Sequence, residues 1–158
     1  MTPGITLAKT ASIAHTIHEY AHDPKHASYG LEAAEKMGVP AAQVFKTLVV
    51  ELDTKELVVG IVPVSTTLNM KAIARAAGAK RAAMADAGRV QRTTGYVLGG
   101  VSPLGQKKLL RTFIDDTAQQ FDAVFVSAGK RGLEIELSPN DLARLTRASY
   151  AGIAESGF

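Results

Sequence analysis

The sequence contains no cysteine, and this absence excludes disulfide bonds, zinc sites with cysteine ligands and a thiol nucleophile on the protein. It also contains no apolar run close to the roughly 18 residues that cross a bilayer. The first residues, Met-Thr-Pro-Gly-Ile-Thr, lack the basic and apolar regions of a secretion signal. We therefore expect no membrane segment and a cytoplasmic location.

Several common catalytic and nucleotide-binding motifs are missing as well. Neither GxGxxG nor HExxH occurs. The run 100–107 resembles a phosphate-binding P-loop only loosely, because Gln106 precedes the lysine and no serine or threonine follows it. Ser102 is a poor candidate for a hydrolase nucleophile, since the next residue, Pro103, has no N–H to donate to an oxyanion.

The residues that are present are typical of a globular protein. The chain has 158 residues, 46% of them hydrophobic and 21% charged, which is enough for one domain with an apolar core. A net charge of +3 favours an anionic partner. If the fold gathers the basic residues, they could bind successive phosphates of such a partner. Alternatively, they are scattered and solvated. The residues concerned are Lys80-Arg81, Lys107-Lys108, Lys130-Arg131, Arg89, Arg92 and Arg111.

Two patterns predict β-hairpins. The first runs from 45 to 64 with a turn at 53–55, and the second runs from 121 to 138 with a turn at 128–132. In the last strand, hydrophobic residues alternate with Glu134 and Glu136, which predicts one buried face and one acidic face.

Helices are expected between and around the hairpins. Most end at a glycine, where a left-handed C-cap belongs, and a further helix begins at Pro139 with Ser138 as its N-cap. The expected helices before it cover residues 3–11, 31–37, 70–77 and 86–93, and an extended segment ends near Tyr20. No repeat or linker interrupts the chain, so we expect one α+β domain over residues 1–158 with a mixed, largely antiparallel sheet.

The segment 93–108 is unusually rich in glycine. Gly99 and Gly100 allow positive φ angles and bring backbone N–H groups close to a ligand, with Lys107 and Lys108 nearby. The segment is either a cradle for an anionic or carbonyl oxygen or a sharp connection between two strands.

Four histidines and one lysine are the other candidates for chemistry. The histidines lie at positions 15, 18, 22 and 26. Asp23-Pro24 interrupts any helix that would align them as metal ligands, so we expect exposed histidines and no metal site. Lys46 opens the first hairpin strand. It is either a solvated strand-end charge or, if it points into a cleft, a group that binds phosphate or polarises a carbonyl.

Several motifs together resemble the YbaK family of Cys-tRNA(Pro) deacylases, which are relatives of the editing domain of prolyl-tRNA synthetase. The resemblance covers essentially the whole chain. The family fold is a mixed sheet or partial barrel surrounded by helices. The motifs, in the order expected for the family, are 20–24, 32–38, 45–48, 84–86, 94–96, 99–105 and 126–132.

The resemblance implies a trans-editing enzyme, a hydrolase or lyase, that cleaves the ester of Cys-tRNA(Pro). By that likeness, the catalytic residues are Lys46, which anchors the substrate, with Gly99 and Gly100, whose backbone faces the ester. The substrate pocket is formed by Tyr20, Thr47, Ser127, Gly129 and Glu134, and the tRNA backbone meets Lys107, Lys108, Lys130 and Arg131. Glu134 stands where better-known members carry aspartate, and Ala128 replaces an expected glycine.

A mechanism proposed for this family needs no protein nucleophile, since the cysteine thiol of the substrate attacks its own ester carbonyl. No metal or organic cofactor is then required. Prolyl-tRNA synthetase is the expected transient partner that delivers the mischarged tRNA. Two alternatives remain: an Ala-tRNA(Pro) deacylase that activates water, and a non-catalytic module that binds the tRNA end.

Overall fold

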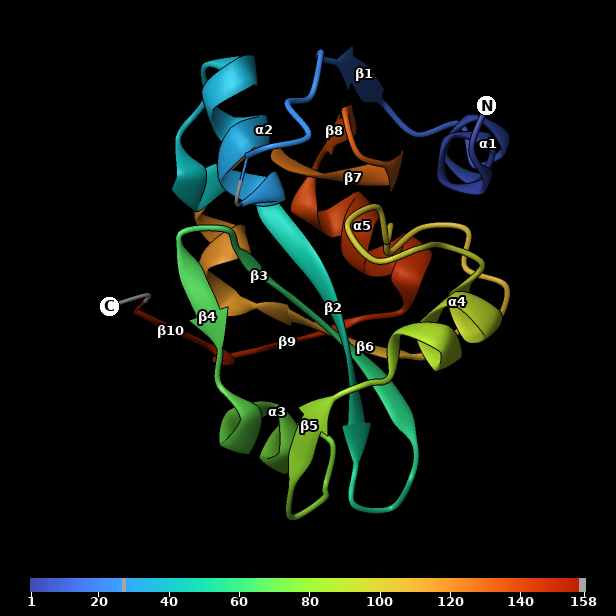
Figure 1. Cartoon of the computed structure of the whole chain (residues 1–158), viewed down its shortest axis with the longest axis vertical. Helices are drawn as coiled ribbons and strands as arrows, with labels where there is room; N and C mark the ends of the chain where they lie inside the picture. The colour runs from blue at the N-terminus through green and yellow to red at the C-terminus, as the bar shows by residue number, and fades with distance from the viewer. Residues whose placement is uncertain (27, 157–158) are drawn as a thin grey trace.

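The chain folds around three β-sheets, as the computed structural model in Figure 1 shows for residues 1–26 and 28–156. The sheets have the strand orders β5-β2-β3-β6-β9, β1-β8-β7 and β10-β4. The strands are β1 His15–Glu19, β2 Phe45–Leu52, β3 Leu57–Pro63, β4 Thr66–Leu68, β5 Ala82–Met84, β6 Arg111–Asp115, β7 Val124–Lys130, β8 Leu133–Leu137, β9 Ser149–Ala151 and β10 Ala154–Ser156.

The α-helices begin and end within two residues of the predicted positions. Polar side chains accept hydrogen bonds from the first turn of each α-helix. Gly38, Gly78 and Gly95 adopt positive φ angles of 68°, 77° and 86° just after their helices. The α-helices are α1 Pro3–Thr10, α2 Tyr29–Met37, α3 Met70–Ala76, α4 Ala87–Thr94 and α5 Pro139–Thr146, and two short 3-10 helices are η1 Ala41–Gln43 and η2 Asp116–Gln120.

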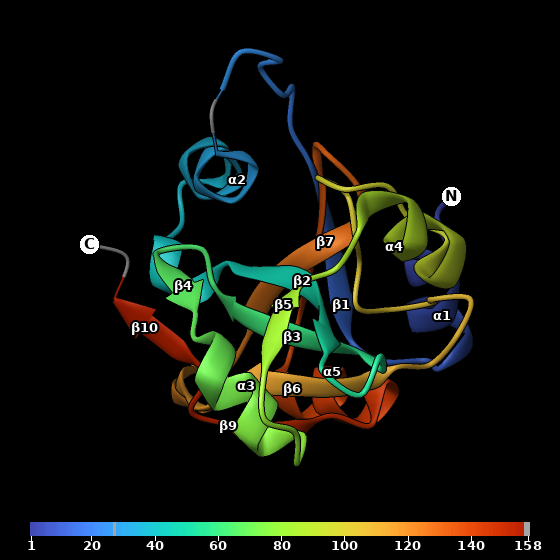
Figure 2. The same ribbon diagram turned by 60° about the horizontal axis from the view of Figure 1, so that its bottom comes forward.

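The first predicted hairpin is confirmed as β2 and β3, which form the centre of the five-stranded sheet. The strands β2, β3 and β5 pair antiparallel, while β3, β6 and β9 pair parallel. All of β3 is buried, because one face packs in the cluster that includes Leu142 of α5 and the other face packs in the cluster that includes Ile73 of α3. The helices α5 and α3 therefore lie on opposite faces of this sheet (Figure 2).

The second predicted hairpin is confirmed as β7 and β8, with two differences. Strand β7 continues to Lys130, which we expected in the turn. The pairing register shifts between Ser127 and Lys130, so that Lys130 still pairs with Leu133 of β8. The predicted acidic face is also only half correct. Glu136 is partly exposed, but Glu134 is 7% exposed because its side of β8 faces a cavity.

The smallest sheet ties the C-terminal part of the chain to the rest. Strand β10 pairs antiparallel with β4, with Ser156 opposite Thr66. The buried carboxylate of Asp115 accepts hydrogen bonds from the backbone N–H groups of Ile153 and Ala154 at 3.0 and 2.8 Å. These contacts hold β4 in place beside the cavity described below.

The expected α+β class and the largely antiparallel pairing are confirmed. The described residues form open sheets and no closed barrel. Within that same part of the chain, none of the helices has the length and apolar character to cross a membrane.

Candidate functional site

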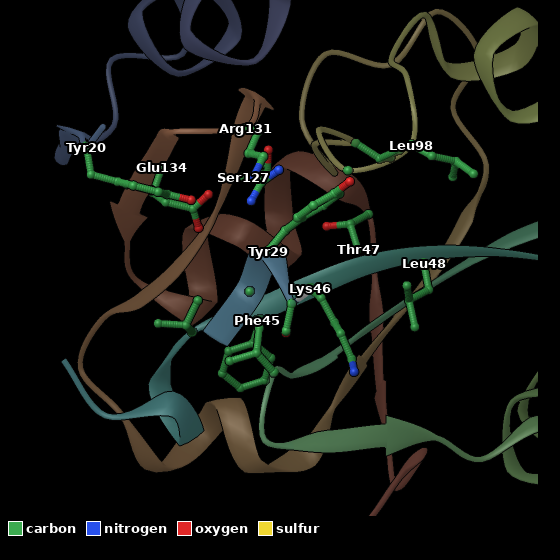
Figure 3. Close-up of a pocket in the computed structure, with 16 residues that line it drawn as sticks. Tyr20, Tyr29, Phe45, Lys46, Thr47, Leu48, Leu98, Ser127, Arg131 and Glu134 are labelled. Atoms are coloured by element: carbon green, nitrogen blue, oxygen red, sulfur yellow. The ribbon is translucent and has the colours of Figure 1, made fainter. Parts of the chain in front are cut away.

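A cavity of about 260 Å³ opens between the start of β2, the start of α2, the loop at Gly99 and the β7–β8 hairpin. Figure 3 shows the side chains that line it. The volume lies near the lower end for small-molecule pockets, which hold roughly 300 Å³ or more. It therefore suits a small group. The lining residues are Tyr20, Ser28, Tyr29, Gly30, Val44, Phe45, Lys46, Thr47, Leu48, Val64, Leu98, Gly99, Val101, Ser127, Arg131 and Glu134.

The structure gathers many of the residues that the sequence analysis singled out. Six of the predicted catalytic and substrate-binding residues line the cavity, namely Tyr20, Lys46, Thr47, Gly99, Ser127 and Glu134. The other two, Gly100 and Gly129, do not line it. Of the four cations expected to meet the tRNA backbone, Arg131 is a lining residue, whereas Lys107, Lys108 and Lys130 are not.

Lys46 points along the cavity edge toward β4 and away from Glu134 (Figure 3). Its Nζ donates a hydrogen bond of 2.6 Å to the carbonyl of Thr66. Partial burial lowers the pKa of the Lys46 ammonium, because desolvation disfavours the charged form. Lys46 is therefore a half-buried cation at the cavity, not a solvated charge at a strand end.

Thr47 supplies an unsatisfied polar atom. Its Oγ1 is buried and has no hydrogen-bond partner among the described residues. A buried hydroxyl without a partner costs roughly 1–3 kcal/mol. Since Thr47 lines the cavity, a polar ligand group would recover that cost.

Glu134 is an almost fully buried acid on the opposite wall, and Figure 3 shows the Tyr20 ring directed toward it. Its carboxyl makes no side-chain hydrogen bond to another described residue, and burial raises its pKa to about 8. Burial also raises the pKa of Tyr20, with the charge of Glu134 as the second cause. At neutral pH the cavity wall thus contains a mainly protonated acid that can donate a hydrogen bond.

This burial predicts a pH-dependent cost to stability. The folded pKa of Glu134 lies above its ordinary value of 4.5, so the folded state binds the proton more tightly and loses stability as pH rises from about 4.5 to 8. Glu134→Gln is expected to raise the free energy of unfolding at pH 8 relative to wild type by on the order of a few kcal/mol. The gain should vanish at pH 4.5.

Denaturant unfolding at both pH values measures this difference, with the exposed Glu19→Gln as the control. An equal effect of Glu134→Gln at the two pH values would contradict the assignment of a neutral, buried acid.

The glycine-rich loop differs from its prediction at one residue. Gly99 has a φ of 89°, but Gly100 has no positive φ. The N–H of Gly100 donates to the carbonyl of Val97 at 3.0 Å, whereas the Gly99 N–H has no acceptor among the described residues. Gly100 is required for packing, because a Cβ there would lie 2.8 Å from the Cα of Lys130. Gly99 is thus the residue of this pair that presents backbone to the cavity.

Arg131 connects three parts of the cavity wall. Its guanidinium lies 3.9 Å from the centre of the Tyr29 ring and donates to Glu32 at 3.1 Å and to the carbonyl of Asp23 at 2.6 Å. Burial acts to raise the pKa of Glu32, but the Asp23 N–H and Arg131 outweigh it and hold that pKa below its usual value. Arg131 therefore braces the wall, while its buried Nε has no hydrogen-bond partner among the described residues.

Tyr29 was missed by the sequence analysis. Its ring lies against Gly99, where an added Cβ would be 2.4 Å from a ring carbon, and the side chain is 46% exposed at the cavity mouth. The apolar lining residues Phe45, Leu98 and Val101 were missed as well. Nothing in the local pattern distinguishes these residues from ordinary core or loop positions.

Ser127 and Gly129 interact with each other. The Ser127 Oγ accepts a hydrogen bond of 3.1 Å from the Gly129 N–H. Gly129 adopts a φ of 123°, and a Cβ there would lie 2.7 Å from the Tyr96 ring. Gly129 therefore orients Ser127 from outside the cavity.

The histidines do not converge. His18 contacts Glu136 at 2.8 Å and His26 contacts Glu35 at 3.3 Å, while His15 bonds the Ile13 carbonyl. These three are partly buried, which corrects the expectation that all four are exposed, and His22 is exposed. In the part of the chain that the structure describes, no group of three or more His, Cys, Asp or Glu side chains has the arrangement of a metal site.

The chemistry available in the cavity follows from its lining. A cation, an acid, several hydroxyls and a free backbone N–H surround an apolar floor. The lining includes no histidine, so none of its hydroxyls has the imidazole base that activates a serine nucleophile. The cavity is therefore built to bind and orient a small polar group.

Comparisons with known proteins agree on one family. The family described as "Aminoacyl-tRNA editing domain" matches residues 24–145. The Enterococcus faecalis protein named "Putative Cys-tRNA(Pro)/Cys-tRNA(Cys) deacylase EbsC" is 36% identical over 152 residues, which cover 96% of this chain and 92% of that protein. The Bacillus subtilis protein YwhH, named as uncharacterized, is 27% identical over 73% of each chain.

A solved structure has the same fold. A crystal structure described as "a putative trans-editing enzyme for prolyl tRNA synthetase" superposes with a TM-score of 0.85 at 22% identity, and the match covers 98% of this chain and 96% of that chain.

Proposed function

The chain belongs to the aminoacyl-tRNA editing domain family, and from that premise we propose that it is a trans-editing deacylase that hydrolyses the ester of Cys-tRNA(Pro). The family resemblance that the sequence suggested is thereby confirmed. The substrate, the mechanism and the roles of the individual residues belong to the proposal.

One observation carries it: a small cavity in which groups that bind an aminoacyl ester converge, and whose described lining residues include neither cysteine nor histidine. Lys46, Glu134 and the Thr47 hydroxyl lie around it. The Thr47 hydroxyl has no hydrogen-bond partner among the described residues. Such a cavity favours a reaction in which the substrate supplies its own nucleophile. The thiol of a cysteinyl ester is correctly placed in the substrate to attack the carbonyl, and orientation alone can lower the barrier of an intramolecular step by roughly 7–11 kcal/mol.

The residues then have defined roles. The Lys46 ammonium binds an oxygen of the terminal adenosine or of the ester, and the Gly99 N–H donates to the oxyanion that develops at the carbonyl. Glu134, Tyr20 and Ser127 bind the polar part of the cysteinyl group. Attack by the thiol sulfur forms a thioester bond and breaks the ester bond. The ribose oxygen leaves with the electron pair of the broken bond and takes up the proton that the thiol loses. Water then hydrolyses the thiolactone.

The partners follow from the substrate. A cavity of this size accepts the aminoacyl group and excludes most of the tRNA, so recognition of tRNA(Pro) comes from outside it. We propose that prolyl-tRNA synthetase delivers the mischarged tRNA, as in the family, and that no metal or cofactor takes part.

The test compares hydrolysis of Cys-tRNA(Pro), Ala-tRNA(Pro) and Pro-tRNA(Pro) by the purified protein, with spontaneous deacylation subtracted. Rapid loss of the cysteinyl ester alone is the expected result. A preference for the alanyl ester would replace the proposal with a water-activating Ala-tRNA(Pro) deacylase. Background rates for all three esters, together with tRNA binding, would leave a non-catalytic binding module.

A further inference from the structure

A second concave surface is lined by residues of α3 and of the segment that leads into β5. Helix α3 lies on the sheet face opposite α5 (Figure 2). We call this concave surface the basic groove. Four of its seven lining residues are cations, and none is acidic. It is lined by Met70, Lys71, Arg75, Ala79, Lys80, Arg81 and Ala82.

The fold brings these cations together from two segments. Lys71 and Arg75 are four residues apart on α3 and share one helix face. Lys80 and Arg81 lie in the link to β5, where the Asp53 carboxylate accepts hydrogen bonds from both of their backbone N–H groups at 3.1 and 3.0 Å. Asp53 thus fixes the link through its backbone and leaves both side chains directed to solvent.

The four side chains keep their charge available. All four are exposed, and none forms an ion pair within 4.0 Å with a described residue. The whole chain has a net charge of +3, so the basic and acidic residues outside the groove nearly cancel. The four cations of the groove alone thus exceed the net charge of the whole chain.

Another cleft with cations is a weaker candidate. It is lined by Lys55, Arg89, Lys108 and Arg111 together with Glu56. Arg111 pairs with Glu56 at 2.8 Å and Arg89 pairs with Glu51 at 3.1 Å. Much of its charge is thus neutralised within the protein.

The basic groove is close to the cavity along the chain. Strand β4 contains Thr66, which accepts the hydrogen bond from Lys46, and α3 begins at Met70. Four residues span at most about 14 Å. Figure 1 shows β4 leading directly into α3. A polymer whose end occupies the cavity would therefore reach the α3 end of the groove within a few nucleotides. Lys80 and Arg81 lie farther from the cavity, beside the end of β2.

We propose that the basic groove binds the sugar–phosphate backbone of the acceptor end of tRNA, next to the nucleotide whose ester enters the cavity. Unpaired lysines and arginines bind phosphates through electrostatic attraction and counterion release. No aromatic side chain lines the groove on which a base would stack. The groove therefore reads the backbone and not the base sequence. The inference depends on the proposed function for the identity of the RNA.

The test measures binding of an uncharged minihelix with the acceptor stem and 3′ end of tRNA(Pro), by fluorescence anisotropy from 50 to 200 mM KCl. The groove variant is Lys71→Gln, Arg75→Gln, Lys80→Gln and Arg81→Gln. Its affinity is expected to fall at least tenfold at 50 mM KCl, and its salt slope by about 3, since each lost phosphate contact removes nearly one unit.

A charge-matched control replaces four other exposed lysines by glutamine: Lys9, Lys25, Lys36 and Lys55. None of these lysines was expected to meet the tRNA backbone. The control is expected to retain affinity within about threefold, because its cations are dispersed. Equal losses in both variants, or wild-type affinity in the groove variant, would overturn the inference. An acidic protein partner would then be the better occupant.

Hydrolysis separates this inference from the proposed function. The cysteinyl ester of adenosine lacks the backbone that the groove binds, so the groove variant is expected to cleave it with wild-type kcat/KM while its KM for Cys-tRNA(Pro) rises. If the wild type cleaved neither ester, the proposed function would fail, and the binding data would still decide the groove. A matching loss on both substrates would indicate damage to the cavity and contradict the groove assignment.

Discussion

Lys46→Ala is expected to lower kcat/KM for Cys-tRNA(Pro) by at least about a hundredfold, because it removes the ammonium that binds an oxygen of the terminal adenosine or of the ester, and the loss of one such preorganised electrostatic contact costs about that much. Lys46 is the cationic side chain at the β4 end of the cavity, and its ammonium is held at 2.6 Å from the Thr66 carbonyl. Alanine removes both the charge and the reach of the side chain. Single-turnover deacylation with limiting substrate measures the effect on the chemical step.

The control for this prediction is Lys36→Ala, which removes a lysine from the exposed surface of α2. It is expected to have wild-type activity. Thermal unfolding of both variants shows whether the fold is intact, since Lys46 also contacts β4. A folded Lys46→Ala variant with full activity would remove Lys46 from the site.

Ser-tRNA(Pro) is expected to react at least about a thousandfold more slowly than Cys-tRNA(Pro). The two esters differ in one atom, but a hydroxyl is deprotonated far less readily than a thiol, and no histidine lines the cavity to activate it. The effective concentration of an oriented intramolecular thiol can exceed 10⁵ M, to order of magnitude. The comparison therefore measures the contribution of the substrate thiol.

A second ester tests whether the substrate thiol is the nucleophile. Cys-tRNA(Pro) whose thiol carries a methyl group keeps its sulfur but cannot form a thiolate, and it is expected to be as stable as the seryl ester. Competition against Cys-tRNA(Pro) hydrolysis shows that both analogues still occupy the site. Rapid hydrolysis of either analogue would require a water activated by the protein and would exclude the thiol as the nucleophile.

The local structure could be predicted from the sequence because it depends on residues that are adjacent in the chain. The hydrophobic runs around 53–55 predicted β2 and β3, and the glycines after the helices predicted their ends, since turn and cap conformations are determined within a few residues. The family resemblance placed Lys46, Gly99 and Glu134 in one site, and all three line the cavity.

The acidic residues of β8 show that alternation along a strand does not predict burial reliably. Alternation predicted that Glu134 and Glu136 share a solvated face, and the pattern is consistent with the strand that forms. Glu134 is nevertheless buried, because that face of β8 is covered by a cavity wall built from segments far away in the chain. A period of two assigns residues to faces but does not say what covers each face.

The helices and hairpins could be predicted from the sequence, because capping, turns and alternation act over a few residues. The family could be predicted because its motifs follow one another in order along the chain. Which side chains meet depends on tertiary packing. Arg131 reaches Glu32, 99 positions away, and this contact braces the cavity wall. Tertiary packing also gathers the cations of α3 and the β5 link into one groove, since charges are brought together by contacts that no local pattern specifies.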